Sequence, residues 1–194
     1  MPLSGETQSG DVHLVCNNGD GVMVAVIDGL GHGEAARTAA RRAMGILAEH
    51  SHAPVIPLVR RCHEALRGTR GVVMSLATFN VADSTMSWIG IGNVTGVLWR
   101  ADPRTSPRQE IVLARGGVVG LRLPPLQATV TAIAAGDLLV FATDGIQPGF
   151  RDLLETPESS PQQLADRILA GYAKGTDDAL VLVARYRGPG ASTL

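Results

Sequence analysis

The sequence predicts an α+β layered sandwich, because strand-like segments lead and trail the chain while the helical patterns between them come in pairs. Residues 34–49 and the segment after Pro57 are two consecutive amphipathic helices, so the order is not the regular alternation of a doubly wound parallel sheet. A length of 194 residues is typical of one domain. We therefore expect a single domain over residues 1–194, with a core from about residue 9 to residue 186.

The first half of the chain begins with a predicted hairpin. Residues 11–16 and 21–27 are apolar runs joined by turn-forming residues at 17–20. Residues 34–49 then repeat small and apolar side chains every three or four positions, which predicts a helix. The second helix follows Pro57 and should stop near Gly68.

Short β-like runs dominate the rest of the sequence. Residues 72–80, 86–91 and 95–100 predict an antiparallel meander, and the polar stretch 101–110 predicts an exposed loop. The remaining predicted elements are strands at 111–114, 128–133 and 138–143, a helix at 162–172 and a strand at 180–186.

Composition excludes several classes of partner. There are 17 Lys and Arg residues against 18 Asp and Glu, a net charge of -1, so no nucleic-acid partner is expected. No apolar run approaches the roughly 20 residues that cross a bilayer, so we expect no membrane contact. Cys16 and Cys62 lack CxxC spacing, and residues 1–6 lack a leader pattern. These features together predict a soluble protein of the reducing cytoplasm.

Acidic residues are placed where strands begin or end. Asp28 and Asp144 each follow an apolar strand, whereas Asp177 and Asp178 precede one. In an antiparallel arrangement these positions share one edge, and the hairpin places Asp11 almost opposite Asp28. Because crowded carboxylates repel one another and lose hydration, the usual remedy is protonation or a bound cation. The sequence therefore predicts a site for hard divalent metals.

Glycines follow two of these aspartates. Gly29 and Gly145 let the chain turn sharply and expose backbone, so the Gly29 carbonyl is a candidate metal ligand. Two metal ions roughly 3.5–4 Å apart can activate water and neutralise phosphate oxygens, which requires no protein nucleophile.

An ordered set of motifs resembles the PPM (type 2C) phosphatases and, among them, the bacterial SpoIIE and RsbU group. The resemblance spans about residues 9–184, and the short chain without added sensor domains is most similar to the RsbX type. The motifs are Ser9-Gly10-Asp11, Asp28-Gly29-Leu30-Gly31-His32-Gly33, Gly92-Asn93-Val94, Thr143-Asp144-Gly145 and Thr176-Asp177-Asp178-Ala179-Leu180.

The resemblance implies a four-layer αββα sandwich, with two central antiparallel β-sheets flanked by helices and a site for two manganese or magnesium ions. Its implied catalytic residues are Asp11, Asp28, Asp144 and Asp177. The implied ligands are Asp28 as the bridge between the metals, the Gly29 carbonyl, Asp144 and Asp177, with Asp11 acting through nearby water and Asp178 ranked lower.

The implied activity is hydrolysis of phosphoserine or phosphothreonine on a protein by an activated water. The implied partners are phosphorylated STAS-domain proteins of the stressosome, which places the enzyme in bacterial stress signalling. The sequence departs from many relatives in one respect, since no Arg or Lys precedes Arg37 to hold phosphate. The chain is also too short for the flap insertion that larger relatives use in substrate recognition.

Two alternatives remain open from the sequence. Residues 31–36 match a GxGxxA dinucleotide fingerprint, but a second helix follows where a Rossmann unit requires a parallel strand. The other alternative is a catalytically silent fold that only binds partners. Asn93 is explained by its Gly-Asn turn, and His32 by packing at the helix entry, although His32 could also contact phosphate.

Overall fold

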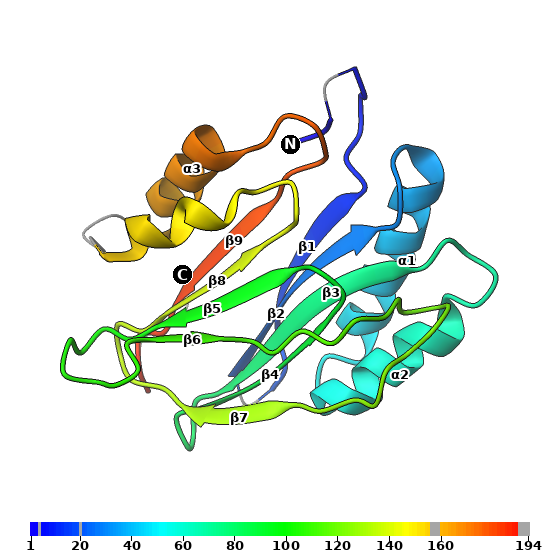
Figure 1. Ribbon diagram of the computed structural model, residues 1–194. Helices are drawn as coiled ribbons and strands as arrows, with labels where there is room; N and C mark the ends of the chain where they lie inside the picture. The colour runs from blue at the N-terminus through cyan, green and yellow to red at the C-terminus, as the bar shows by residue number, and fades with distance from the viewer. Residues whose placement is uncertain (4, 20, 156–159, 190–194) are drawn as a thin grey trace.

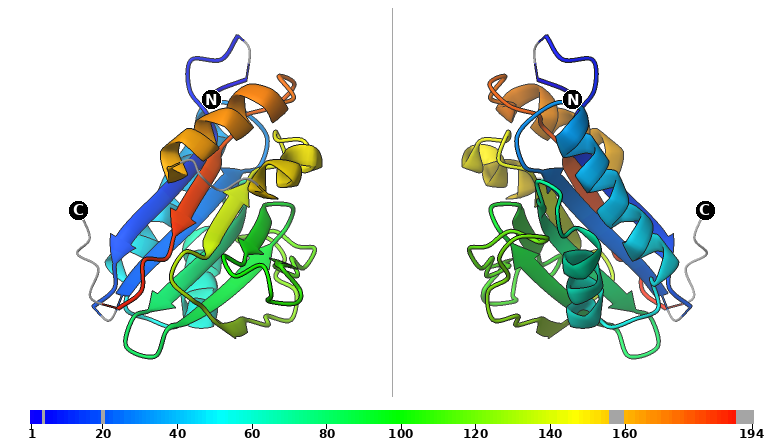
Figure 2. Two further views of the ribbon diagram at one scale, coloured as in Figure 1. Left: turned by 90° about the vertical axis from the view of Figure 1, so that its left-hand side faces the viewer. Right: turned by 90° about the vertical axis from the view of Figure 1, so that its right-hand side faces the viewer.

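Two antiparallel sheets lie face to face between two pairs of helices in the computed structural model, which describes residues 1–3, 5–19, 21–155 and 160–189. Figure 1 shows these four layers from left to right, and Figure 2 shows the helices covering the outer faces. The predicted αββα sandwich is therefore confirmed. Among the described residues, no helix is long and apolar enough to span a membrane.

The first sheet has five strands in the order β1-β2-β3-β4-β7. They are β1 (Asp11–Asn17), β2 (Gly21–Gly29), β3 (Val72–Asn80), β4 (Thr85–Ile91) and β7 (Thr129–Ala132). The second sheet has four strands in the order β6-β5-β8-β9. They are β6 (Gln109–Ile111), β5 (Thr95–Trp99), β8 (Leu138–Ala142) and β9 (Val181–Arg185).

Helices cover the outer face of each sheet. α1 (Glu34–Glu49) and α2 (Val55–Ala65) pack on the first sheet, while the 3-10 helix η1 (Pro148–Glu155) and α3 (Pro161–Tyr172) pack on the second. α3 begins with a capping box between Ser160 and Gln163, which satisfies backbone N–H groups at its first turn. Apolar side chains, among them Trp88 and Phe141, fill the space between the two sheets.

The side of α1 that faces the sheet is built from small residues. The predicted apolar positions Ala36, Ala39, Ala40, Ala43 and Leu47 are all buried. Because alanine adds only one carbon beyond the backbone, the helix approaches the end of β2 closely. This close approach places the first turn of α1 beside the acidic residue that ends the strand.

Three predicted elements differ from the structure. α2 begins at Val55 rather than after Pro57, because the first four N–H groups of a helix need no intrahelical partner and so tolerate proline. The strand predicted at 111–114 is wrong in its bounds: it lies at Gln109–Ile111, so it begins inside the segment 101–110 predicted as a loop and overlaps the prediction only at Ile111. Beyond it the chain bends, since Ala114 N–H donates to the Val112 carbonyl at 2.9 Å. η1 was not predicted.

Candidate metal centre

The predicted hairpin register is confirmed at the end of the first sheet. Asp11 is directly opposite Asp28 in the β1–β2 pairing. β8 and β9 are also antiparallel, so Asp144 after β8 and Asp177 before β9 reach the same end of the sandwich. This is the upper end in Figure 1.

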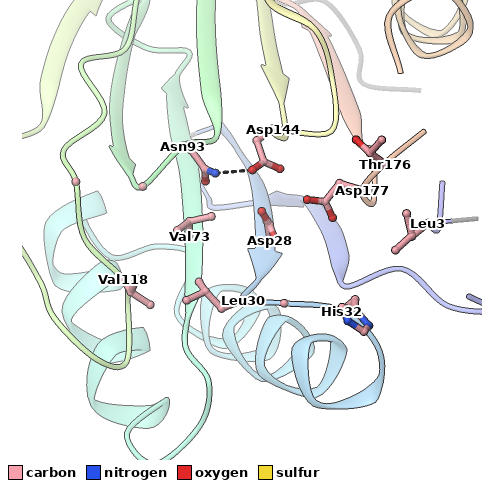
Figure 3. Close-up of a pocket in the computed structure, with 13 residues that line it drawn as sticks. Leu3, Asp28, Leu30, His32, Val73, Asn93, Val118, Asp144, Thr176 and Asp177 are labelled. Atoms are coloured by element: carbon pink, nitrogen blue, oxygen red, sulfur yellow. Dashed lines mark hydrogen bonds between the residues drawn. The ribbon is translucent and has the colours of Figure 1, made fainter. Parts of the chain in front are cut away.

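A pocket of about 660 Å³ opens at this end. Three of the predicted acidic residues line it, namely Asp28, Asp144 and Asp177, and their carboxylates point toward a common space (Figure 3). The remaining lining residues are Leu3, Leu30, Gly31, His32, Val73, Gly92, Asn93, Gly116, Val118 and Thr176. The predicted residues Asp11, Gly29 and Asp178 do not line the pocket and lie beside or behind it.

Asp11 is buried, and Asp28 opposite it is half-buried. Burial, together with the charges of Asp178 and Asp144, raises the pKa of Asp11 to about 7 against a hydrogen bond from Thr143 that lowers it. Burial and the charges of neighbouring aspartates, Asp11 first among them, raise the pKa of Asp28 to about 8. The N-terminal ammonium of Met1 lowers the pKa of Asp11 in part, whereas every cause acting on Asp28 raises its pKa.

Thr143 is a supporting residue that the sequence analysis did not single out. Its hydroxyl donates to Asp11 Oδ2 at 2.8 Å and accepts from Leu180 N–H at 2.9 Å. The threonine is buried and so fixes Asp11 relative to β9. Its only signal in the sequence was its place in the Thr143-Asp144-Gly145 motif.

Asp144 is held from two sides. Asn93 Nδ2 donates to Asp144 Oδ2 at 2.7 Å (Figure 3), and Lys174 Nζ donates to the Asp144 backbone carbonyl at 2.5 Å. Burial and the charge of Asp177 raise the pKa of Asp144, while Lys174 and the Asn93 hydrogen bond lower it. The turn predicted for Asn93 therefore also orients an acidic side chain. Lys174 is the only lysine in the sequence, a signal that the sequence analysis did not use.

The two adjacent aspartates before β9 have different surroundings. Asp177 is exposed and lines the pocket, and its Oδ1 accepts from Asp178 N–H at 2.8 Å. Asp178 is buried, and its two oxygens accept from Leu3 N–H at 2.7 Å and Gly10 N–H at 2.6 Å. Asp178 thus holds the N-terminal segment against the site through these two hydrogen bonds.

Glycine is required on steric grounds after two of the three pocket aspartates, Asp28 and Asp144. A Cβ on Gly29 would lie 2.1 Å from the Ala36 carbonyl oxygen, and a Cβ on Gly145 would lie 1.9 Å from the Asp178 carbonyl oxygen. Both contacts are with backbone, which cannot move aside cheaply. The Asp-Gly pairs therefore allow α1 and the start of β9 to pack directly against the acidic strand ends.

The chemistry of the donor set fits a hard divalent cation. Three carboxylates face one pocket. The pKa values of Asp28 in the pocket and of Asp11 beside it are strongly raised, so added positive charge is favourable there. In the part of the chain that the structure describes, no three His, Cys, Asp or Glu side chains already enclose a metal-sized space.

The dinucleotide alternative does not fit the topology. α1 leads into α2, and the next strand, β3, is antiparallel to β2. A Rossmann unit requires a parallel strand at this point. Within the glycine-rich turn, His32 lines the pocket and its Nδ1 lies 3.2 Å from Glu6 Oε1.

Solved structures share this fold over nearly the whole chain. One solved structure is described as "The bacterial stressosome: a modular system that has been adapted to control secondary messenger signaling". It is 29% identical to this chain with a TM-score of 0.87, and the match covers 95% of each chain. RsbX in complex with magnesium is 19% identical with a TM-score of 0.84, covering 94% of this chain and 90% of the other. The PP2C phosphatase domain of SpoIIE from Bacillus subtilis has a TM-score of 0.76 at 18% identity, covering 95% of this chain and 60% of the other.

The αββα sandwich is thus the fold of PP2C-type phosphatase domains. The family model described as Stage II sporulation protein E (SpoIIE) matches residues 18–187, and the chain belongs to that family. Phosphoserine phosphatase RsbX of Bacillus subtilis (strain 168) is 24% identical over 94 residues. That match spans 48% of this chain and 47% of the relative.

Proposed function

We propose that this protein is a metal-dependent phosphatase that hydrolyses phosphoserine or phosphothreonine in a protein substrate. The observation that carries the proposal is that Asp28, Asp144 and Asp177, from three separate strand ends, face one pocket. Membership of the SpoIIE family and the similarity to a phosphoserine phosphatase support the same activity.

In this proposal Asp28, the Gly29 carbonyl, Asp144 and Asp177 hold one or two manganese or magnesium ions, and Asp11 supports Asp28 from behind. Bound divalent cations would supply the positive charge that stabilises phosphate oxygens and lowers the pKa of water. The protein's own contribution is orientation. Thr143 fixes Asp11, and the Asn93 amide fixes Asp144, so that the acidic groups need little rearrangement.

We propose phosphorylated STAS-domain proteins of the stressosome as substrates, in the cytoplasm and in stress signalling. The 29% identity to a structure described under the stressosome and the similarity to RsbX support this assignment. The assignment rests on likeness between proteins rather than on the chemistry of the pocket.

The activity is tested by phosphate release from a phosphoserine peptide and from p-nitrophenyl phosphate, with manganese and after exhaustive chelation. We expect turnover only with the metal, because crowded carboxylates without a cation do not hold an anionic substrate. Full activity after chelation would contradict the proposal. Asp28→Ala should abolish turnover while the protein stays folded, with Asp152→Ala as a control on the exposed part of η1.

The same assay separates this function from a silent fold that only binds partners. A silent fold predicts no turnover by the wild type with either metal or substrate, and no loss of partner binding in Asp28→Ala. Three of the four predicted acids line one pocket and the fourth, Asp11, pairs with Asp28, which favours the enzyme.

Substrate choice is tested by comparing an intact phosphorylated STAS domain with a peptide copied from its phosphorylation site, in identical manganese. We expect a much higher kcat/KM for the domain, because contacts far from the phosphate help to position it. Equal kcat/KM for the two would refute recognition of the folded partner and leave the phosphatase activity standing.

A further inference from the structure

An acidic pocket that receives an anionic substrate needs positive charge near its opening. The first 36 residues contain no Lys or Arg, so β1, β2 and the turn into α1 supply none. Two cationic side chains elsewhere have contacts that tie them to the residues around the pocket. They are Lys174, beside Asp144, and Arg70, beside Gly31.

Lys174 is hydrogen-bonded to the backbone of the site. Its Nζ donates to the Asp144 carbonyl at 2.5 Å, and its backbone N–H donates to the Gly145 carbonyl at 2.8 Å. A lysine held in this way stabilises the turn after β8. One of the three N–H groups of its ammonium is used in this bond, which fixes the position of the side chain.

Arg70 has a different situation. It is exposed, and its Nη1 lies 2.7 Å from the position that a Cβ on Gly31 would occupy. Gly31 lines the pocket, and because it has no side chain the guanidinium of Arg70, which does not itself line the pocket, lies directly beside it. Gly31 also has a φ of 83°, which favours glycine there. Within the described ranges of the chain, no hydrogen bond or ion pair engages the Arg70 side chain.

The backbone that carries Arg70 is well held. Thr69 Oγ1 donates to the Leu66 carbonyl at 2.7 Å and accepts from Gly71 N–H at 3.1 Å. Leu30 N–H in turn donates to the Gly71 carbonyl at 3.1 Å, which joins the Arg70 loop to the pocket-lining turn. The backbone of Arg70 is therefore fixed next to a pocket-lining turn, so only the Arg70 side chain has to become ordered when a ligand binds.

We propose that Arg70 binds the phosphoryl group of the substrate at the rim of the pocket, an inference that rests on the proposed phosphatase function. A guanidinium presents a planar set of N–H donors that matches two phosphate oxygens at once. Arg70 thereby supplies, from the loop between α2 and β3, a cationic side chain of the kind that the first 36 residues do not contain. Lysine would replace its charge but not its paired donors.

The first test measures inorganic phosphate binding by calorimetry in manganese, for the wild type, Arg70→Ala and Arg70→Lys. Arg61→Ala is the matched control, because Arg61 is an exposed arginine on α2. Loss of charge-assisted hydrogen bonds should weaken phosphate binding by about 10- to 100-fold in Arg70→Ala. Arg70→Lys should recover part of this loss, and Arg61→Ala should match the wild type.

The second test measures kinetics with p-nitrophenyl phosphate, which carries a phosphoryl group and no neighbouring peptide. We expect Arg70→Ala to raise KM by a similar factor while the melting temperature stays that of the wild type. Phosphate binding within twofold of the wild type, or a defect seen with phosphopeptides alone, would overturn the proposal. Because calorimetry requires no turnover, phosphate binding through Arg70 by a protein that hydrolyses nothing would refute the proposed function and retain this inference.

Discussion

Replacing Asp28 by asparagine should stabilise the metal-free protein at alkaline pH. Asp28 has a pKa of about 8 in the fold against an ordinary value of 3.8, because burial and neighbouring aspartates oppose its ionisation. A carboxyl group with a raised pKa leaves the fold fully stable below about pH 4 and removes stability as the pH rises toward 8. Asparagine keeps the size of the side chain and removes this cost.

The size of the effect follows from the shift. About four pKa units correspond to an upper bound of ~5–6 kcal/mol at pH 8 and above, at 1.36 kcal/mol per unit. Water reaches part of this side chain and several acids share the repulsion, so we expect about 1–3 kcal/mol. For a protein of this size that gain raises the melting temperature by roughly 3–10 °C.

The assay is thermal and urea denaturation in chelator at pH 5 and pH 8. The wild type should lose stability between these two pH values, and Asp28→Asn should lose less. Asp152→Asn, an exposed acid on η1, is the control and should follow the wild type. Adding manganese at pH 8 should stabilise the wild type more than Asp28→Asn, since a cation bound to the folded state adds to its stability. An asparagine variant no more stable than the wild type at pH 8 would refute the electrostatic reasoning.

Three further variants test the packing and orientation of the site. Gly29→Ala should lower the free energy of unfolding by about 1–3 kcal/mol, because its Cβ would lie 2.1 Å from a backbone oxygen of α1. The control is Gly45→Ala in α1, where no atom lies near the new Cβ, and this variant should be neutral or slightly stabilising. Equal melting temperatures for Gly29→Ala and Gly45→Ala would contradict this reasoning. Asn93→Ala should lower kcat by about 10-fold without unfolding, since Asp144 loses its 2.7 Å hydrogen bond; unchanged kinetics would show that the bond is dispensable. Asp178→Ala should speed amide hydrogen exchange at Leu3 and Gly10, because the Asp178 carboxylate accepts hydrogen bonds from both N–H groups. Unchanged exchange at these two residues would show that Asp178 does not hold the N-terminal segment.

The local parts of the site were predictable from the sequence because they depend on register. Alternation along a hairpin and the turn at residues 17–20 place Asp11 opposite Asp28, and the structure confirms this pairing. Antiparallel strands also predicted that Asp144 and Asp177 share an edge with Asp28, and all three line one pocket. The metal-binding roles given to these residues stay predictions.

The supporting contacts could not be predicted because they join residues far apart in the chain. Thr143 reaches Asp11 across 132 positions, and Asn93 reaches Asp144 across 51. Such pairs depend on how the two sheets stack, and strand periodicity does not specify that stacking. The strand near residue 111 was misplaced because its pairing ends at a local bend after Ile111.

The most direct test of the metal centre is anomalous diffraction from crystals grown with manganese. The account predicts an anomalous peak in the pocket within coordination distance of Asp28 and of Asp144 or Asp177, and a loss of that peak in Asp28→Asn. A wild-type crystal with no peak in this pocket at saturating manganese, or with its manganese bound elsewhere, would contradict the account.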